Sequence, residues 1–229
     1  MLSHDRATAR AEKSRRELTS VAIDCFARYG FQGTSVDRIA SIAGVTKGAI
    51  YYHFRDKDDL LSAAVMDRIA EFEARVETGC SGSSAADALR RIAKVCIDHA
   101  EDGDHSRFVI SIIVESIDTN AKISAQLRDM MRRFRAFVRN LVRRGQQDGS
   151  FRTDADAAEI AANYVSSVLG AEIQFYQDRE NVDLTAALMP AVERILADLS
   201  RPAAGVKTDS GGLSVASAES RTNKGVTQP

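Results

Sequence analysis

The segment SVDRIASIAGVTKGAIYYHF, residues 35–54, carries the side chains best suited to recognising another molecule. Its spacing predicts two short helices joined by a glycine-containing turn, the helix-turn-helix arrangement. In that arrangement the first helix crosses the DNA backbone and the second enters the major groove. The exposed side of the second helix therefore predicts contacts to bases and phosphates. The candidate DNA-contacting residues from this pattern are Thr46, Lys47, Gly48, Ala49, Tyr51, Tyr52, His53 and, at the start of the next helix, Lys57.

Each residue type in this set suits a different part of the contact. Thr46 places a hydroxyl at the start of a helix, where backbone N–H groups favour phosphate, and Lys47 supplies a cation for a base edge or a phosphate. Gly48 and Ala49 are small enough for close approach, and the aromatic residues after them end in polar atoms suited to phosphate oxygens. The pattern alone leaves open that these residues are the incidental surface of a three-helix core.

The elements that must position these residues are predicted to be helices. All three prolines lie in the last forty residues, and no alternating β-branched run is present, so we expect an all-α fold. We expect Gly30 to end the first helix and Thr34 to cap the second in a capping box with Asp37. The expected helices span Ala11–Tyr29, Val36–Ala43, Lys47–Tyr52, Lys57–Glu77, Ala85–Ala100, Ser106–Asp118, Ala121–Gln147, Asp154–Asp178 and Leu184–Leu199.

Composition excludes several other classes of protein. The 229 residues carry a formal net charge of −1, so only a local patch can bind a polyanion. The longest apolar run, Phe108–Val114, is too short to span a membrane, and the charged N-terminus lacks a secretory signal. Together with three cysteines in no metal-like spacing, this predicts a cytoplasmic protein. No nucleophile–base set or phosphate loop is present, so we expect no enzyme, no cofactor and no bound metal.

The first quarter of the chain resembles the N-terminal module of the TetR/AcrR family of bacterial transcriptional regulators. The resemblance runs from about Ala11 to Ala74, in AIDCFARYGFQGTSVDRIA and AGVTKGAIYYHFRDKDDLL. It implies that Thr34 and Ser35 bind phosphate and that the residues named above, other than Ala49, touch DNA. It also implies an all-helical protein, commonly of nine helices, that acts as a homodimer on palindromic operators and is released from DNA by a small effector.

The rear part of the chain is expected to bind that effector. Phe108, Ser111, Ile112 and Glu115 share one face of an otherwise apolar helix, where a carboxylate is costly unless paired or wetted. A flexible Met and Phe stripe on the next helix suits a permissive pocket for an apolar or aromatic molecule. Ordinary core packing and an ion pair are the alternatives. The candidate pocket residues are Phe108, Ser111, Ile112, Glu115, Met130, Met131, Phe134 and Tyr164.

The last two helices are expected to form a dimer seam, because apolar and small residues recur there at helical spacing. Burial within one subunit is the alternative, and periodicity does not separate the two. The candidate interface residues are Ala161, Val165, Val168, Leu169, Val192, Ile195, Leu196 and Leu199.

Two other clusters have simpler interpretations. His99, Asp102, Asp104 and His105 could hold a metal, but a helix end at Gly103 followed by an acidic N-cap at Asp104 is the simpler account, since no Cys and no closely spaced helical His pair is present. The arginine-rich stretch of residues 128–144 could be a second nucleic-acid contact, but paired surface charge is the simpler account.

The sequence therefore predicts a DNA-binding domain at 11–56, a ligand-binding and dimerisation domain at 57–200 joined through the helix at 57–77, and a disordered tail at 201–229. The expected function is a homodimeric, sequence-specific transcriptional repressor that an apolar or aromatic small molecule releases from a palindromic operator. The alternative is a helical small-molecule or metal sensor whose DNA module is vestigial. An all-α enzyme using Glu115 is a further rival that lacks a second catalytic group.

Overall fold

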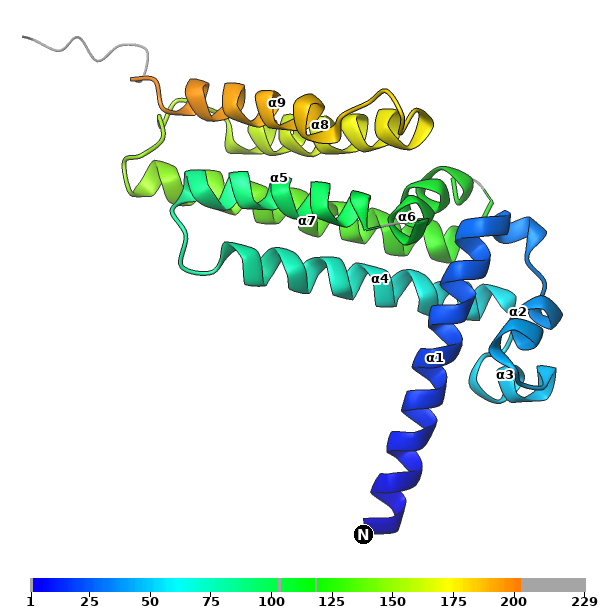
Figure 1. The fold of residues 1–229 in the computed structure, drawn as a ribbon. Helices are drawn as coiled ribbons and strands as arrows, with labels where there is room; N and C mark the ends of the chain where they lie inside the picture. The colour runs from blue at the N-terminus through cyan, green and yellow to red at the C-terminus, as the bar shows by residue number, and fades with distance from the viewer. Residues whose placement is uncertain (1, 103, 118, 203–229) are drawn as a thin grey trace, which may run out of the picture.

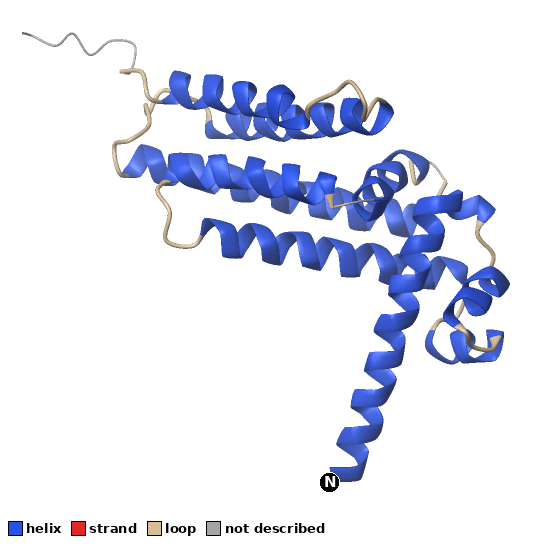
Figure 2. Cartoon of the chain, viewed as in Figure 1, coloured by secondary structure: helices blue, strands red, loops and turns tan. Residues whose placement is uncertain are grey.

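A computed structural model describes residues 2–102, 104–117 and 119–202, and within them the chain forms nine α-helices and no strand (Figures 1 and 2). The all-α fold is therefore confirmed. The helices are α1 Leu2–Gly33, α2 Val36–Ala43, α3 Lys47–His53, α4 Lys57–Cys80, α5 Ala85–Glu101, α6 Asp104–Glu115, α7 Ala121–Gln147, α8 Ala157–Gln177 and α9 Leu184–Leu199. The predicted tail falls almost wholly outside the described residues.

Side-chain caps explain where most of these helices begin. Thr46 caps α3 as expected, and its Oγ1 accepts from the N–H of Ala49 at 3.2 Å. The cap of α2 is Ser35, whose Oγ accepts from the N–H of Arg38 at 3.1 Å. The predicted Thr34–Asp37 capping box is therefore wrong by one residue, because the Thr34 side chain turns into the core instead.

The predicted boundaries of α2, α7 and α9 agree with the structure residue for residue. The largest difference is in α1, which begins at Leu2 and continues to Gly33 instead of ending at Tyr29. Gly30 nevertheless breaks its regular helix with a φ of 70°, a conformation that glycine adopts without steric cost. The N-terminal part of α1 extends away from the body of the molecule (Figure 1).

The rear helices form layers, with α8 and α9 outermost, α5 and α7 in the middle and α4 on the other side (Figure 1). One apolar core joins the end of α4 to α5, α8, α9 and the second half of α7. A second core joins α1, α2, α3 and the first half of α4 to side chains of α6 and the start of α7. No described helix is long and apolar enough to cross a bilayer.

Candidate DNA interface and regulatory cavity

The α2–turn–α3 unit is held by a small set of buried residues. Ile39 of α2 and Ile50 of α3 are almost fully buried, and Phe54, directly after α3, is 2 % exposed. The turn between the helices contains Gly44 in the left-handed conformation, and the N–H of Val45 donates to the carbonyl of Ala40 at 3.0 Å. Because the apolar side of α3 is fixed in this way, its polar side must face outward.

The outward side of α3 carries the residues that sequence reasoning selected. Tyr51 and Tyr52 are 46 % and 79 % exposed, which is high for aromatic side chains of a folded protein. Thr46, Lys47 and Gly48 are also exposed, while Ala49 and His53 are half-buried. The outward side of α3 thus carries one hydroxyl and one ammonium at the helix start and two phenols in its last turn.

Lys47 does not point freely into solvent. Its Nζ lies 2.9 Å from Oδ2 of Asp37 on α2, and this hydrogen bond raises the pKa of Lys47. Both side chains are well exposed, and exposed ion pairs contribute little to stability. Lys47 can therefore exchange Asp37 for a phosphate or a base edge at small cost. Asp37 lies ten residues away on another helix, so no local pattern indicates it as the partner of Lys47.

Two of the other candidates have structural tasks. Thr34 is 1 % exposed, and its hydroxyl donates to the carbonyl of Gly30 at 2.7 Å, so the expected phosphate contact from this hydroxyl is corrected. Nζ of Lys57 donates to the carbonyls of Phe31 at 2.9 Å and Thr34 at 3.1 Å. It thereby ties α4 to the end of α1, and one of its three N–H groups remains for a phosphate. Ser35 is exposed.

A second feature is an apolar cavity of about 60 Å³ lined by α4, α5, α6, α7 and α8 and partly open to solvent. It has room for a few water molecules, whereas pockets for drug-sized ligands measure roughly 300–1,000 Å³. A larger ligand would have to displace side chains of the lining. The lining residues are Arg68, Ile69, Phe72, Cys96, His99, Val109, Ile110, Ile113, Met130, Met131, Phe134, Val168, Leu169, Glu172 and Tyr176.

Three of the eight predicted pocket residues, Met130, Met131 and Phe134, line this cavity. The α6 residues of the prediction do not line this cavity, because a helix that is apolar almost all round gives no sign of which side faces it. Phe108 and Ile112 are buried, Ser111 is exposed, and Glu115 lies in an open groove at the junction with α1.

Tyr164 is also absent from the cavity lining. Its ring is fully buried in the rear core, and its hydroxyl donates to the carbonyl of Leu89 at 2.6 Å. That bond satisfies the polar atom, so Tyr164 fixes α8 against α5 within the subunit.

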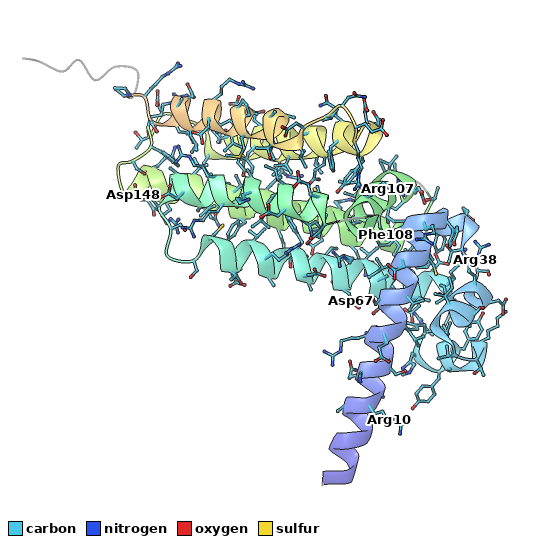
Figure 3. The ribbon with its side chains drawn as sticks, viewed as in Figure 1. Arg10, Arg38, Asp67, Arg107, Phe108 and Asp148 are labelled. Atoms are coloured by element: carbon cyan, nitrogen blue, oxygen red, sulfur yellow. The ribbon has the colours of Figure 1, made fainter. Side chains whose placement is uncertain are left out.

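Helix α6 instead connects the two parts of the molecule. Phe108 stacks on Phe26 of α1 with the ring centroids 6.0 Å apart, where α6 meets α1 (Figure 3). The neighbouring Arg107 donates to the carbonyl of Ala27 at 3.3 Å. Val109 and Ile113, one position further along from Phe108 and Ile112, line the cavity. A single short helix therefore contacts both the DNA-binding core and the cavity.

His99 and Glu172 are two titratable side chains of the cavity lining. The sequence pattern indicated His99 only as a possible metal ligand and did not indicate Glu172. Burial and the nearby Arg68 and Arg75 lower the pKa of His99 to about 4, so its imidazole is neutral at pH 7. Burial raises the pKa of Glu172 to about 8. A carboxyl inside the apolar face of α8 is the signal that could have revealed Glu172, because such groups are seldom buried without a purpose.

Six of the eight residues of the predicted dimer seam are already buried within the subunit. Ala161, Val165 and Val168 of α8 and Val192, Leu196 and Leu199 of α9 are buried inside the subunit, and Leu169 and Ile195 are half-buried. These residues pack α8 and α9 on each other and on α5 and α7. The opposite side of the layer remains exposed. It carries Ala158, Ala162, Ser166 and Ile173 of α8 and Ala186, Pro190 and Ala197 of α9.

The remaining two clusters are now partly explained. His99 and Asp102 both contact Arg75, at 3.1 Å and 2.7 Å, and the side chains of Asp104 and His105 lie outside those described. No group of three or more potential metal ligands occurs among the described residues. On α7, Arg133 pairs with Glu73 of α4 at 2.8 Å.

The architecture defines a class: an all-helical protein with an N-terminal helix-turn-helix unit and a larger rear domain around an apolar cavity. Sequence models of two families match, "Bacterial regulatory proteins, tetR family" over residues 18–64 and "Tetracyclin repressor-like, C-terminal domain" over residues 85–189. The chain belongs to the TetR family, whose members are DNA-binding transcriptional regulators.

Individual relatives agree with this assignment. The chain is 26 % identical over 193 residues to the HTH-type transcriptional repressor KstR2 of Rhodococcus jostii, covering 82 % of this chain and 92 % of that protein. A TetR transcriptional regulator of Chloroflexus aurantiacus shares the fold with a TM-score of 0.74, 24 % identity and coverage of 85 % and 98 %. A regulator of Saccharomonospora viridis, solved in complex with choline, gives a TM-score of 0.74, 24 % identity and coverage of 83 % and 99 %.

Proposed function

We propose that this chain is a cytoplasmic, homodimeric repressor that binds a palindromic operator and is released by a small-molecule effector. The observation that carries the DNA-binding part is the outward face of α3, where Thr46, Lys47, Tyr51 and Tyr52 surround a small residue at the helix start. This set offers donors to phosphates and bases and lets the helix backbone come close to the groove.

In the proposed complex α3 lies in the major groove. The hydroxyl of Ser35 and one N–H of Lys57 contact flanking phosphates, and Lys47 leaves Asp37 to reach DNA. Two such units read two half-sites about 34–36 Å apart, one helical turn of DNA. A twofold-symmetric protein then requires a palindromic site.

The dimer that sets this spacing is proposed to use the exposed side of α8 and α9. Ala162 and Ser166 are small and allow close packing, and Ile173 at 40 % exposure supplies apolar area. This replaces the face expected from periodicity, which is occupied within the subunit. Size-exclusion chromatography with light scattering tests it, because an arginine in place of Ala162 should yield monomers.

Release is proposed to begin in the cavity. A ligand larger than the present space displaces lining side chains, and we expect Val109 and Ile113 of α6 to be among them. The same helix carries Phe108 into the core that holds α1. The ligand shifts the protein between two states only by its difference in affinity for them. The effector class expected from the lining is an apolar or aromatic molecule.

The first experiment is selection of bound fragments from a sheared genomic library by the purified full-length chain at about 0.15 M salt, which suppresses non-specific phosphate binding. Recovery of one palindromic site is the expected result, and Lys47→Ala should lose it. Recovery of no preferred sequence, with and without removal of copurified small molecules, would refute the repressor function. It would favour a helical ligand-binding protein with a vestigial DNA module.

A further inference from the structure

The cavity contains one carboxyl that its own protein surroundings do not explain. Glu172 of α8 is 8 % exposed and lines the cavity. Among the described residues, no hydrogen bond or ion pair joins its carboxyl to another side chain or to the backbone. A buried ionisable group is costly unless it is paired, so a single unpaired carboxyl in an apolar chamber points to a partner that enters from outside.

The other charged groups around the cavity do not supply that partner. Arg68 of α4 pairs with Glu71 through Nη1 at 2.7 Å, its Nε is buried without a hydrogen-bond partner among the described residues, and no ion pair joins it to Glu172. Arg179 lies over the rings of Phe175 and Tyr176. On α5, Cys96 has a pKa raised by burial, so its thiol is neutral, and His99 is neutral at pH 7 because its pKa is lowered. The lining side chains of α6 and α7 are Val, Ile, Met and Phe. Glu172 is thus the single acidic group facing this chamber from its described lining.

Aromatic rings stand in the same chamber. Phe72 of α4 and Phe134 of α7 meet edge to face with their centroids 5.6 Å apart, and both line the cavity with Glu172. The face of an aromatic ring attracts a cation, and it does so more strongly where water is excluded. A carboxyl and aromatic faces in one apolar chamber are complementary to a positively charged group on an apolar body.

We propose that the effector is an apolar cation, with an ammonium group that pairs with Glu172 and a hydrocarbon or aromatic body that lies among Phe72, Phe134 and the methionines of α7. This deepens the proposed function, because it rests on the rear domain being the effector site and names the chemistry that the site selects. A ligand carboxylate would oppose the ionised form of Glu172, and an uncharged ligand would supply no charge that stabilises it.

The pairing has a measurable consequence for protons. Burial raises the pKa of Glu172 to about 8, so the carboxyl is mostly protonated in the free protein at pH 7. A bound cation favours the ionised form, and the proton then leaves to the buffer. Binding of a permanently charged cation should therefore release close to one proton at pH 7. Its affinity should rise as the pH increases from 6 to 8 and then level off.

The test is isothermal titration calorimetry of the full-length chain without DNA. Three probes share a ten-carbon chain and differ in their head group: decyltrimethylammonium, 1-decanol and decanoate, each below its micelle concentration. We expect the ammonium probe to bind about tenfold more tightly than the alcohol, with decanoate weakest. Titrations in phosphate and in Tris, which differ in ionisation enthalpy, measure the released proton.

Two matched variants assign the effect to the carboxyl. Glu172→Gln keeps the shape and removes the charge, so it should lower the affinity for decyltrimethylammonium to that for decanol and abolish proton release. Glu159→Gln makes the same change on the exposed side of α8 and should change neither quantity. Circular dichroism of both variants checks that the fold is retained.

The proposal is overturned if the ammonium probe does not bind, if decanoate binds as tightly, or if Glu172→Gln binds the ammonium probe like the parent. Since no DNA is present, these outcomes are independent of the operator selection. A chain that selects an operator but ignores the ammonium probe would refute this inference alone, whereas a chain that binds the probe through Glu172 but selects no DNA would refute the repressor function alone.

Discussion

Replacing Gly48 by alanine should make the free protein more stable and its complex with DNA weaker. Gly48 lies inside α3 with an exposed surface, and the nearest atom that an added Cβ would meet is Oγ1 of Thr46 at 3.8 Å, an ordinary contact. No strain therefore opposes the substitution. Alanine is the better helix former by about 0.5–1 kcal/mol, which corresponds to a Tm about 1–4 °C higher in a chain of this size.

In the proposed complex with DNA, the Cβ that alanine adds at position 48 has no free space. If the backbone of α3 lies against the groove at Gly48, the added carbon pushes the helix outward. Overpacking of a close-fitting contact costs about 1–3 kcal/mol, so operator affinity should fall by about fivefold or more per subunit. The two measurements thus move in opposite directions, which a general loss of folding does not produce.

The assay combines thermal unfolding of the free protein with fluorescence anisotropy on the selected operator at one salt concentration. Asn140→Ala is the control, because Asn140 is exposed on α7 and the change also favours the helix, by about 0.5 kcal/mol, far from α3. It should raise Tm and leave the affinity unchanged. Undiminished operator affinity in Gly48→Ala would show that α3 does not approach DNA as closely as we propose.

Three further predictions concern other parts of the molecule. Lys47→Ala should weaken operator binding. It should also reduce the slope of log K against log salt by about 1.8 for a dimer, because each lost phosphate contact lowers the slope by about 0.9. Asp37→Asn should tighten operator binding, because it removes the competing partner of Lys47. Gly145→Ala should lower the free energy of unfolding by about 1–3 kcal/mol in urea, because its Cβ would come within 2.7 Å of Cε2 of Phe151. Because the pKa of His99 is lowered to about 4 in the folded protein, the unfolded chain binds a proton more readily. The free energy of unfolding should therefore fall as the pH decreases from 6.5 towards about 4, and His99→Gln should reduce this pH dependence.

Each of these has a contrary result. An unchanged salt slope in Lys47→Ala would mean that this lysine reads a base or does not touch DNA. A stabilised Gly145→Ala would mean that the Phe151 ring moves aside without cost, and Phe151→Leu should rescue the variant if it does not. A parent chain equally stable at pH 6.5 and pH 4.5 would show that His99 is protonated inside the fold.

Local signals predicted the front of the molecule well. The cap at Thr46, the left-handed glycine at position 44 and the apolar spacing of Ile39 and Ile50 are all decided within a few residues, so the helix-turn-helix and its outward face could be read directly. Thr34 was misassigned because two adjacent hydroxyl residues can both cap a helix. Only the packing of α1 against α2 decides which of them turns inward.

The rear of the molecule was less readable because its helices are apolar on more than one side. In α8 the buried Ala161 and the exposed Ala158 and Ala162 are the same residue type, so periodicity could not say which side meets the same subunit. In α6 the same ambiguity moved the expected pocket to Phe108 and Ile112. Long-range packing, which no local pattern encodes, decided both cases.

The two apolar cores have a consequence for how such a protein could be recombined. The core around α1–α3 includes Phe108 and Ile112 of α6 and Ile123 and Leu127 of α7, so it does not end where the helix-turn-helix ends. A domain boundary at residue 57 would separate these four side chains from their neighbours and expose one side of the core that supports the helix-turn-helix. A chimera that gives this chain a foreign sensor should therefore keep α6 and the first turns of α7 with the native front half. For the same reason, substitutions on the buried side of α6 that change ligand binding are also expected to change the stability of the DNA-binding core.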